Sequence, residues 1–321
     1  MDCVKLTLEP ASDFGTPLVG DTLFGHLCWA LRWRQGEQAL ATLLQGYTEG
    51  RPFAVVSDAF SAGWLPKPSL PLARLGVVGS AADRKADKAR VWLPAEDAAL
   101  PLAQWCLRAA AQPGSTASAR LGIVTQNTIN RMTGTTGTGA FAPRQVERIV
   151  HPPGARLEVY VLLDGSRLPR NLLLQALTDV GQAGYGRDAS TGLGKFSVNA
   201  LESWSWRAGA GAKHGLTLSA CAPDPAELEA GDCHYQPVTR FGRHGSVHVH
   251  TGQPFKRPLL LLRTAAVLAF MARGVPAFHG RGLGGLQAPI SDAEPATVHQ
   301  GYAPLVPLHL PDLAEPRGDA A

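Results

Sequence analysis

The chain is short of cysteine, of long apolar runs and of any strong excess of one charge, and each shortage excludes a class of protein. Its five cysteines are scattered without a Cys-x-x-Cys pair, which argues against a disulfide framework or a zinc ribbon and favours a reducing compartment. The longest apolar stretch, Pro258 to Ala272, carries Arg263 and is too short to span a membrane. Because no apolar signal core follows Met1, we expect a cytoplasmic protein with no membrane partner.

The 321 residues carry a net charge of only +4, but the cations are unevenly distributed. Residues 64–160 contain twelve Lys or Arg but only six Asp or Glu, and Arg84, Lys85, Lys88 and Arg90 form one cluster. A basic stretch of this kind is compatible with a polyanion such as RNA. It is also typical of a solvated helix face.

Motifs of catalysis and of metal binding are likewise missing. The chain has no Gly-x-Ser-x-Gly elbow, and the series His244, His248 and His250 has no nearby cysteine, so it is a weak zinc signal. We therefore predict no metal and no cofactor. Asp21 and Asp58 are interpreted as structural, with Asp21 accepting the first free N–H groups of a helix.

The most informative segment is a glycine-rich loop between a helical and an extended pattern. Gly184, Gly186, Gly192 and Gly194 alternate there with Arg187, Ser190, Thr191 and Lys195. Glycines let backbone N–H groups approach an anion, and the cations and hydroxyls add further phosphate ligands. Because the helix precedes the glycines, the loop matches neither the Walker loop nor the dinucleotide fingerprint. A long helix-to-strand connection is the alternative interpretation.

The periodicities predict an α+β fold with two domains, covering residues 1–203 and 204–321. In the first we expect a strand over 4–8, helices over 21–34 and 39–44, and a β run over 53–60. An insertion over 76–120 with a helix at 103–111 follows, and then a hairpin over 121–150. A strand over 157–163 leads to the helix, loop and strand around the glycines. This order favours a ferredoxin-like sheet. In the second domain, strands are expected over 214–221 and 233–239, and residues 259–271 form either a buried helix or two strands joined by a bend.

Several blocks follow one another in an order that resembles a known family. They are Gly20–Leu27, Val56–Phe60 with Leu65–Pro68, Asn127–Arg131, the glycine-rich loop, and Val298–Ala303. Together they resemble the RAMP-superfamily subunit that caps the crRNA 5′ handle in type III-A CRISPR interference (Csm) complexes.

The resemblance implies two ferredoxin-like (RRM-like) domains, a glycine-rich loop between them and a projecting β-hairpin that acts as a thumb on the crRNA. It implies an RNA-binding subunit that is not an enzyme and whose partners are the crRNA 5′ handle, the large polymerase-cyclase subunit and a backbone RAMP subunit. The Thr/Gly-rich hairpin tip over 132–139 and the alanine-rich insertion depart from the family pattern, so the contacts of the thumb transfer least directly.

The resemblance, carried onto this chain, and the residues themselves predict three groups of RNA contacts. They are the loop residues Gly184, Tyr185, Gly186, Arg187, Ser190, Thr191, Gly192, Gly194 and Lys195, the hairpin residues Asn127 and Arg131, and a basic set of Arg240, Arg243 and Lys256. This last set, in which His244 also lies, is interpreted from the sequence itself as a wall of the same groove. Tyr185 either stacks on a base or anchors packing, and the hairpin residues are alternatively held by their own hydrogen bonds.

Two other functions fit the same residues. One is a metal-independent RAMP endoribonuclease in which His26, His244 or His248 acts as general acid or base. The other is the equivalent capping subunit of a type III-B complex.

Overall fold

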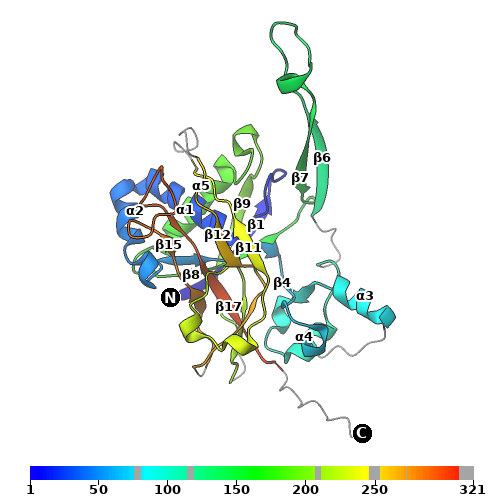
Figure 1. The fold of residues 1–321 in the computed structure, drawn as a ribbon, viewed down its shortest axis with the longest axis vertical. Coiled ribbons are helices and arrows are strands. Elements are labelled where there is room, and N and C mark those ends of the chain that lie inside the picture. Colours follow the sequence, from blue (N-terminus) through cyan, green and yellow to red (C-terminus); the bar gives the residue numbers. More distant parts are fainter. Residues whose placement is uncertain (76–80, 114–118, 207–210, 246–253, 273, 311–321) are drawn as a thin grey trace.

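A computed structural model describes residues 1–75, 81–113, 119–206, 211–245, 254–272 and 274–310 as a mixed α/β fold with several antiparallel sheets (Figure 1). The largest sheet has the strand order β2-β8-β1-β9, with β3 also paired to β8. Its strands are β1 (Asp2–Pro10), β2 (Ala54–Val56), β3 (Phe60–Ser61), β8 (Leu157–Leu163) and β9 (Phe196–Trp204). Alternating Val4, Leu6 and Leu8 on β1 are buried, as the sequence pattern predicts.

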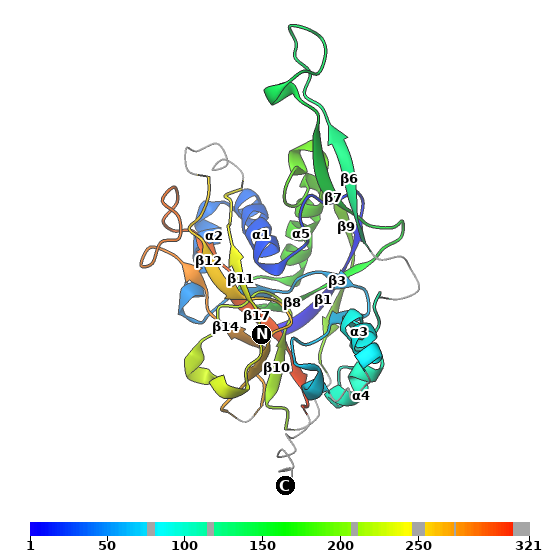
Figure 2. The ribbon, with the colours of Figure 1, turned by 45° about the vertical axis from the view of Figure 1, so that its right-hand side comes forward.

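Two helices pack against this sheet, α1 (Gly20–Gln35) and α5 (Arg170–Ala183), and lie side by side (Figure 2). The apolar stripe of α1 is buried through Leu23, Phe24, Leu27 and Leu31. A short α2 (Glu37–Leu44) follows, and the 3-10 helix η1 (Tyr47–Glu49) leads to β2. The two helices predicted over 21–34 and 39–44, between the first strand and the next, are therefore confirmed.

The insertion packs against the C-terminal sheet, because its Leu93 and Trp105 belong to one buried apolar cluster with Leu216, Val267 and Val306. It comprises η2 (Leu72–Leu75), α3 (Ala81–Ala89), η3 (Ala95–Asp97) and α4 (Leu102–Leu107), and β5 (Trp92–Pro94) pairs with β4 (Trp64–Pro66). Trp105 is fully buried and its indole N–H donates to the carbonyl of Pro94 at 2.7 Å. A tryptophan with both its ring buried and its N–H bonded is a strong packing anchor.

A hairpin stands away from the rest of the molecule (Figures 1 and 2). It is formed by β6 (Arg120–Gln126) and β7 (Arg144–Val150), paired from Arg120↔Val150 to Gln126↔Arg144, with η4 (Gly139–Phe141) near its tip. The predicted hairpin is thus present. Apolar side chains along it are exposed, including Leu121 and Ile123.

The C-terminal half contains a four-stranded sheet of order β13-β10-β17-β14 and two ribbons. The sheet strands are β10 (His214–Thr217), β13 (Val267–Ala269), β14 (Phe278–Gly280) and β17 (Tyr302–Leu308). The ribbons pair β11 (Pro237–Arg240) with β12 (Leu259–Leu262), and β15 (Leu283–Gly284) with β16 (Val298–His299); η6 (Pro225–Glu227) and η7 (Ala230–Asp232) are short turns. Residues 259–271 therefore form two strands with a bend and not a buried helix.

The expected second ferredoxin-like domain differs from what is seen. Among the described residues after α5 there is no α-helix, so the alternation of strands and helices that such a sheet needs is not found there. Prolines recur through this half, for example Pro223, Pro237, Pro254 and Pro276. Each removes a backbone donor and blocks helix propagation, which favours short strands and turns.

The two halves meet at the start of α1. The carboxyl of Asp58 accepts the N–H of Gly20 at 2.7 Å and the hydroxyl of Thr264 at 2.5 Å. The side chain of Gln300 both accepts from the N–H and donates to the carbonyl of Val56, at 2.8 and 2.7 Å. Asp58 therefore caps α1 from outside the helix, and the expectation that Asp21 does so is wrong, because Asp21 makes no cap hydrogen bond.

No helix in the described part of the chain is long and apolar enough to cross a membrane.

Two helical glycines give opposite predictions for stability. A Cβ at Gly25 in α1 meets nothing within 4 Å, whereas at Gly181 in α5 it overlaps the carbonyl oxygen of Phe196. Gly25→Ala is expected to raise the free energy of unfolding by about 0.5–1 kcal/mol through helix propensity. Gly181→Ala is expected to lower it by about 1–3 kcal/mol through overpacking. Urea unfolding of both variants measures this, and equal shifts in one direction contradict the packing described for α5.

Candidate nucleic-acid interface

The glycine-rich loop lies directly on the segment that joins β1 to α1. The N–H of Gly194 donates to the carbonyl of Asp13 at 2.8 Å, and the N–H of Lys195 donates to the hydroxyl of Ser12 at 2.9 Å. The carbonyl of Lys195 in turn accepts the N–H of Ala11 at 2.8 Å. Two connections distant in sequence therefore form one rigid unit.

Glycine is required where these two connections touch. Gly186 has φ +74°, and a Cβ there would overlap the hydroxyl of Thr16. Gly194 has φ +72°, and a Cβ there would overlap the carbonyl of Tyr185. The left-handed conformation and the close approach both exclude larger residues. Part of the glycine pattern thus serves the fold of the loop itself.

Tyr185 anchors the loop in the core. Its side chain is fully buried; the hydroxyl donates to the carbonyl of Pro17 at 2.8 Å and accepts the N–H of Val19 at 3.0 Å. Its ring lies 5.0 Å from that of His26, centroid to centroid. The expectation that Tyr185 stacks on a base is therefore corrected in favour of its alternative, a packing anchor, because no face of the ring is open.

The loop's backbone N–H groups are largely used within the protein. Those of Gly184, Tyr185 and Gly186 donate to the carbonyl of Val180, the carbonyl of Gly194 and Nε2 of His26, respectively. The expected cradle of glycine N–H groups is consequently not open to phosphate at these positions, because each donor already has an acceptor.

What the loop leaves exposed is its polar side chains. Arg187, Ser190, Thr191 and Lys195 all reach the surface. The guanidinium of Arg187 donates to the carbonyl of Glu147 at 2.7 Å, and its Nε lies 3.8 Å from Asp188. Any phosphate contacts would therefore fall to these cations and hydroxyls, while Gly192 is exposed at the turn between them.

The base of the hairpin is attached to the same unit, whereas its tip is remote. Phe14 and Ile149 exchange two backbone hydrogen bonds of 2.9 and 2.8 Å, and Arg148 lies 3.8 Å from Asp13. Asn127 and Arg131 are exposed beyond the last ladder pair. The structure thus brings Arg187 to the hairpin base but places Arg131 near the far end.

The predicted basic set divides into inward and outward members. Nε of Arg240 lies 2.8 Å from the buried carboxyl of Asp21, which also lies 3.6 Å from Nε2 of His299. Lys256 is half-buried, and burial lowers its pKa. Only Arg243 is exposed, with its guanidinium 5.8 Å from the centroid of Phe255. Arg240 and Lys256 are thus turned toward protein.

Of the histidines considered for catalysis or metal binding, the structure describes His26 and His244. His244 is buried with Nε2 2.6 Å from the hydroxyl of Ser291, and His248 and His250 lie outside the described residues. Burial lowers the pKa of His26 to about 4, so its ring is neutral at pH 7. In the described portion of the chain, no group of His, Cys, Asp or Glu residues could hold a metal ion.

Two segments approach one face of α1. Gly186 donates to His26, and a Cβ at Gly245 would lie 3.1 Å from Nε1 of Trp29. His26 and Trp29 are three residues apart, about 4.5 Å along the helix axis. The glycine-rich loop and the end of the β11–β12 ribbon therefore flank the same surface.

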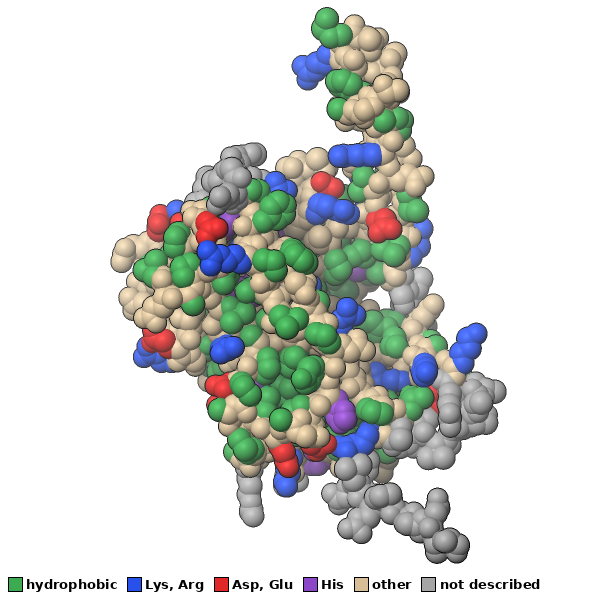
Figure 3. All heavy atoms as spheres, viewed as in Figure 1, with side chains coloured by type: hydrophobic (Ala, Val, Ile, Leu, Met, Phe, Trp, Pro, Cys, Tyr) green, Lys and Arg blue, Asp and Glu red, His purple; other side chains and the backbone are tan. Residues whose placement is uncertain are grey.

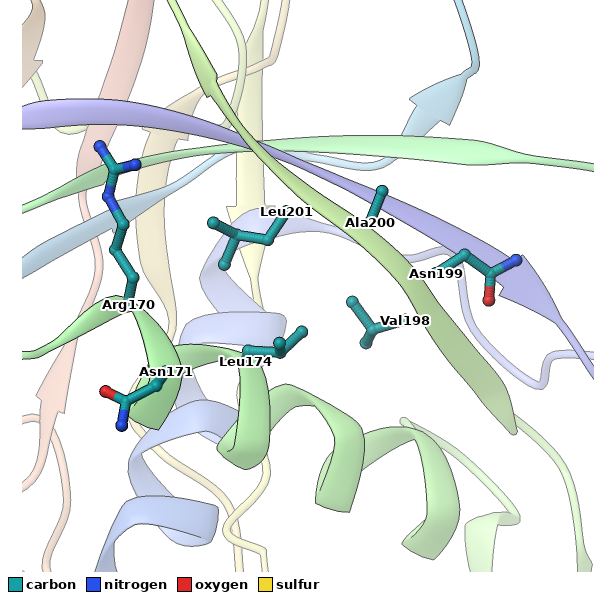
Figure 4. A pocket seen from close by; sticks show the side chains of 7 residues that line it. All are labelled: Arg170, Asn171, Leu174, Val198, Asn199, Ala200 and Leu201. Atoms are coloured by element: carbon teal, nitrogen blue, oxygen red, sulfur yellow. The ribbon is translucent and has the colours of Figure 1, made fainter.

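A shallow groove that the sequence pattern did not indicate lies between α5 and β9 (Figure 4). It is lined by Arg170, Asn171, Leu174, Val198, Asn199, Ala200 and Leu201. Its floor is mostly apolar and it includes no residue predicted to bind RNA. We assign it no part in the candidate interface.

Comparison with known proteins shows which solved structures share this fold. No protein-family model and no curated protein matches the chain. Among solved structures, a chain of a Csm1–Csm4 cassette in complex with cA4 has a TM-score of 0.58 at 15% identity, covering 97% of this chain and all of that one. A cassette in complex with pppApA gives 0.57 at 16% over the same shares.

A third solved structure extends the likeness to a different assembly. A chain of the Csm3–Csm4 subcomplex of the type III-A CRISPR-Cas interference complex gives a TM-score of 0.57 at 12% identity, covering 96% of this chain and 99% of that chain. The resemblance drawn from the sequence blocks is therefore confirmed at the level of fold, over nearly the whole chain.

The pH dependence of stability follows from two carboxyls at the start of α1. Burial raises the pKa of Asp58 from 3.8 to about 6, so the folded state holds its proton more tightly and stability falls as pH rises from about 4 to 6. For Asp21, burial acts upward but His299 and Arg240 outweigh it, and the pKa falls to about 2. Its stabilisation is therefore lost below about pH 4.

Asp58→Asn separates these effects. The amide can accept from Gly20 and donate to Thr264, but it does not titrate. Between pH 4 and 6, urea unfolding is expected to show a decline of about 1–3 kcal/mol in the wild type that the variant lacks. The acid limb below pH 4 is expected to remain. An identical decline in both proteins contradicts the assignment to Asp58.

Proposed function

We propose that the chain is a non-catalytic RNA-binding subunit of a type III-A CRISPR effector, anchoring the 5′ handle of crRNA. The observation that carries the proposal is the exposed set Arg187, Ser190, Thr191 and Lys195 on a loop held by backbone hydrogen bonds to the segment that joins β1 to α1. Rigid presentation lowers the entropy lost when phosphates are bound. The fold likeness to chains of Csm assemblies supports the same assignment.

The arrangement of the first domain supports a ferredoxin-like, RRM-related fold. Its strands follow the order β2-β8-β1-β9, with α1 after β1 and α5 after β8. This is the order of a split βαβ sheet. On such a domain the hairpin would act as the thumb, with its exposed Asn127 and Arg131 against the crRNA.

The proposed partners follow from the assemblies in which similar chains occur. Those chains are found in a Csm1–Csm4 cassette and a Csm3–Csm4 subcomplex. We infer that this chain joins a large polymerase-cyclase subunit to a backbone RAMP subunit. Its mechanism is then assembly: the loop holds the handle while separate surfaces contact the two proteins.

Binding without cleavage agrees with the state of the histidines near the loop. Nε2 of His26 accepts the N–H of Gly186, and the low pKa keeps the ring neutral. A general acid needs a proton to give at working pH, and a general base needs an accessible lone pair. His26 offers neither to RNA.

The role of the loop predicts a salt-dependent loss of affinity. In Arg187→Ala with Lys195→Ala, the affinity for single-stranded RNA carrying the 5′ handle is expected to fall about tenfold or more. The slope of log affinity against log salt is expected to become shallower by about 1.4, since two phosphate contacts are removed. Titration at several salt concentrations measures both.

The matched control removes the same charge elsewhere. Arg51 and Lys213 are exposed residues outside the loop, so Arg51→Ala with Lys213→Ala is expected to leave the slope almost unchanged. Equal losses in both double variants indicate nonspecific attraction and argue against the loop as the handle site.

Absence of catalysis is tested directly. The purified chain is incubated with repeat RNA in EDTA, and the RNA is expected to stay intact over hours while remaining bound. Clean cleavage at the handle boundary would establish the endoribonuclease alternative. Loss of that cleavage in a folded His26→Ala, His244→Ala or His248→Ala variant then shows that the cleavage belongs to the chain.

A further inference from the structure

The β11–β12 ribbon continues past its regular ladder toward α1. Arg240 pairs with Leu259, and beyond it the N–H of Lys256 donates to the carbonyl of Gly242 at 2.8 Å. Arg243 and Phe255 form the next bridge, and the N–H of His244 donates to the carbonyl of Pro254 at 2.8 Å. The extension is thus ordered by backbone hydrogen bonds.

This extension has an inner and an outer face because side chains alternate along a strand. Arg240, Lys256 and the buried His244 lie on the inner face. On the outer face Phe241 is 71% exposed, Phe255 is 64% exposed and Leu260 is 74% exposed. Figure 3 shows hydrophobic side chains gathered over the part of the surface where Figure 1 draws these strands.

We propose that Phe241 and Phe255, with Arg243, form a stacking platform for an unpaired base of single-stranded RNA. Exposed aromatic faces beside cations are the combination that binds single-stranded nucleic acid, because bases stack while cations meet phosphates. The guanidinium of Arg243 already lies over the ring of Phe255. Among the described residues no carboxylate forms an ion pair with Arg243, so its charge remains available to RNA.

The position of the platform connects it to the glycine-rich loop. Two residues after Arg243, Gly245 abuts Trp29 on α1, and the loop abuts His26 three residues earlier. The glycine-rich loop and the end of the ribbon extension therefore border the same stretch of α1. The inference rests on the proposed function, since it concerns bases adjoining the handle phosphates.

The experiment separates stacking from charge. Full-length Phe255→Leu and Phe241→Leu are titrated with single-stranded handle RNA and with a series in which one nucleotide at a time is abasic. Tyr235→Leu is the matched control, because Tyr235 is also an exposed aromatic, 53% exposed and outside the platform. Thermal unfolding checks that each variant is folded.

Support for the platform has a defined signature. Phe255→Leu is expected to weaken binding about tenfold, with an unchanged salt slope because phosphate contacts persist. For the RNA that lacks the base that stacks on Phe255, the wild type and Phe255→Leu are expected to bind with equal affinity, because the interaction that the substitution removes is already absent. Tyr235→Leu is expected to bind every RNA as the wild type does.

Other outcomes overturn the inference and are distinguishable. If both Phe variants bind RNA normally while Arg187→Ala with Lys195→Ala does not, the platform is wrong and the handle site stands. If the Phe variants bind RNA normally but fail to associate with another subunit of the complex, the patch is a protein interface. If the wild type fails to bind the RNA, the proposed function fails and the platform with it.

Discussion

The carboxyl of Asp58 is the point on which the arrangement of the interface depends. It caps α1 at Gly20 and holds Thr264 from the C-terminal half. Because α1 is fixed at its first residue, the positions of His26 and Trp29 along it are fixed as well. The segments that approach those two residues come from different halves of the chain, and the carboxyl of Asp58 is one of the groups that join the start of α1 to the C-terminal half.

The candidate site illustrates how a glycine-rich loop can be rigid. Its glycines do not supply freedom of movement; they permit close contact with the 11–17 segment, and Tyr185 ties the loop to Pro17 and Val19. Backbone donors are used inside, and cationic side chains are presented outside. This arrangement favours electrostatic binding, because side chains on a rigid loop lose little conformational entropy when they bind.

Local pattern was sufficient for α1, α2 and α5, for the hairpin and for the helix–loop–strand order around the glycines, because each depends on neighbours in sequence. In the insertion α3 was not predicted, and the helix expected over 103–111 is α4, which ends at Leu107. It was not sufficient for Asp21 or Tyr185. Asp21 has the residue type and position of a cap, but a distant arginine, Arg240, and His299 compete for its carboxyl. Tyr185 is buried by contacts with residues about 160 positions away.

Local sequence pattern also could not predict which members of the basic set are exposed to solvent. Arg240 and Arg243 are similar in sequence context, but ribbon alternation and the place of Asp21 decide which one faces solvent. Adjacent aromatics were a usable signal, since Phe241 follows Arg240 and Phe255 precedes Lys256. Their exposure depends on long-range pairing, which no local window contains.

The projecting hairpin has a consequence for the stability of this part of the chain. Its two strands pair with each other over seven residue pairs, β7 is joined to the body by the bridge between Ile149 and Phe14, and Leu121 and Ile123 are exposed to solvent. A lone two-stranded ribbon is marginally stable in water. Beyond Glu147, whose carbonyl accepts Arg187, the arm is held by the pairing of its own two strands. A partner that covered its exposed apolar side chains would therefore add to its stability.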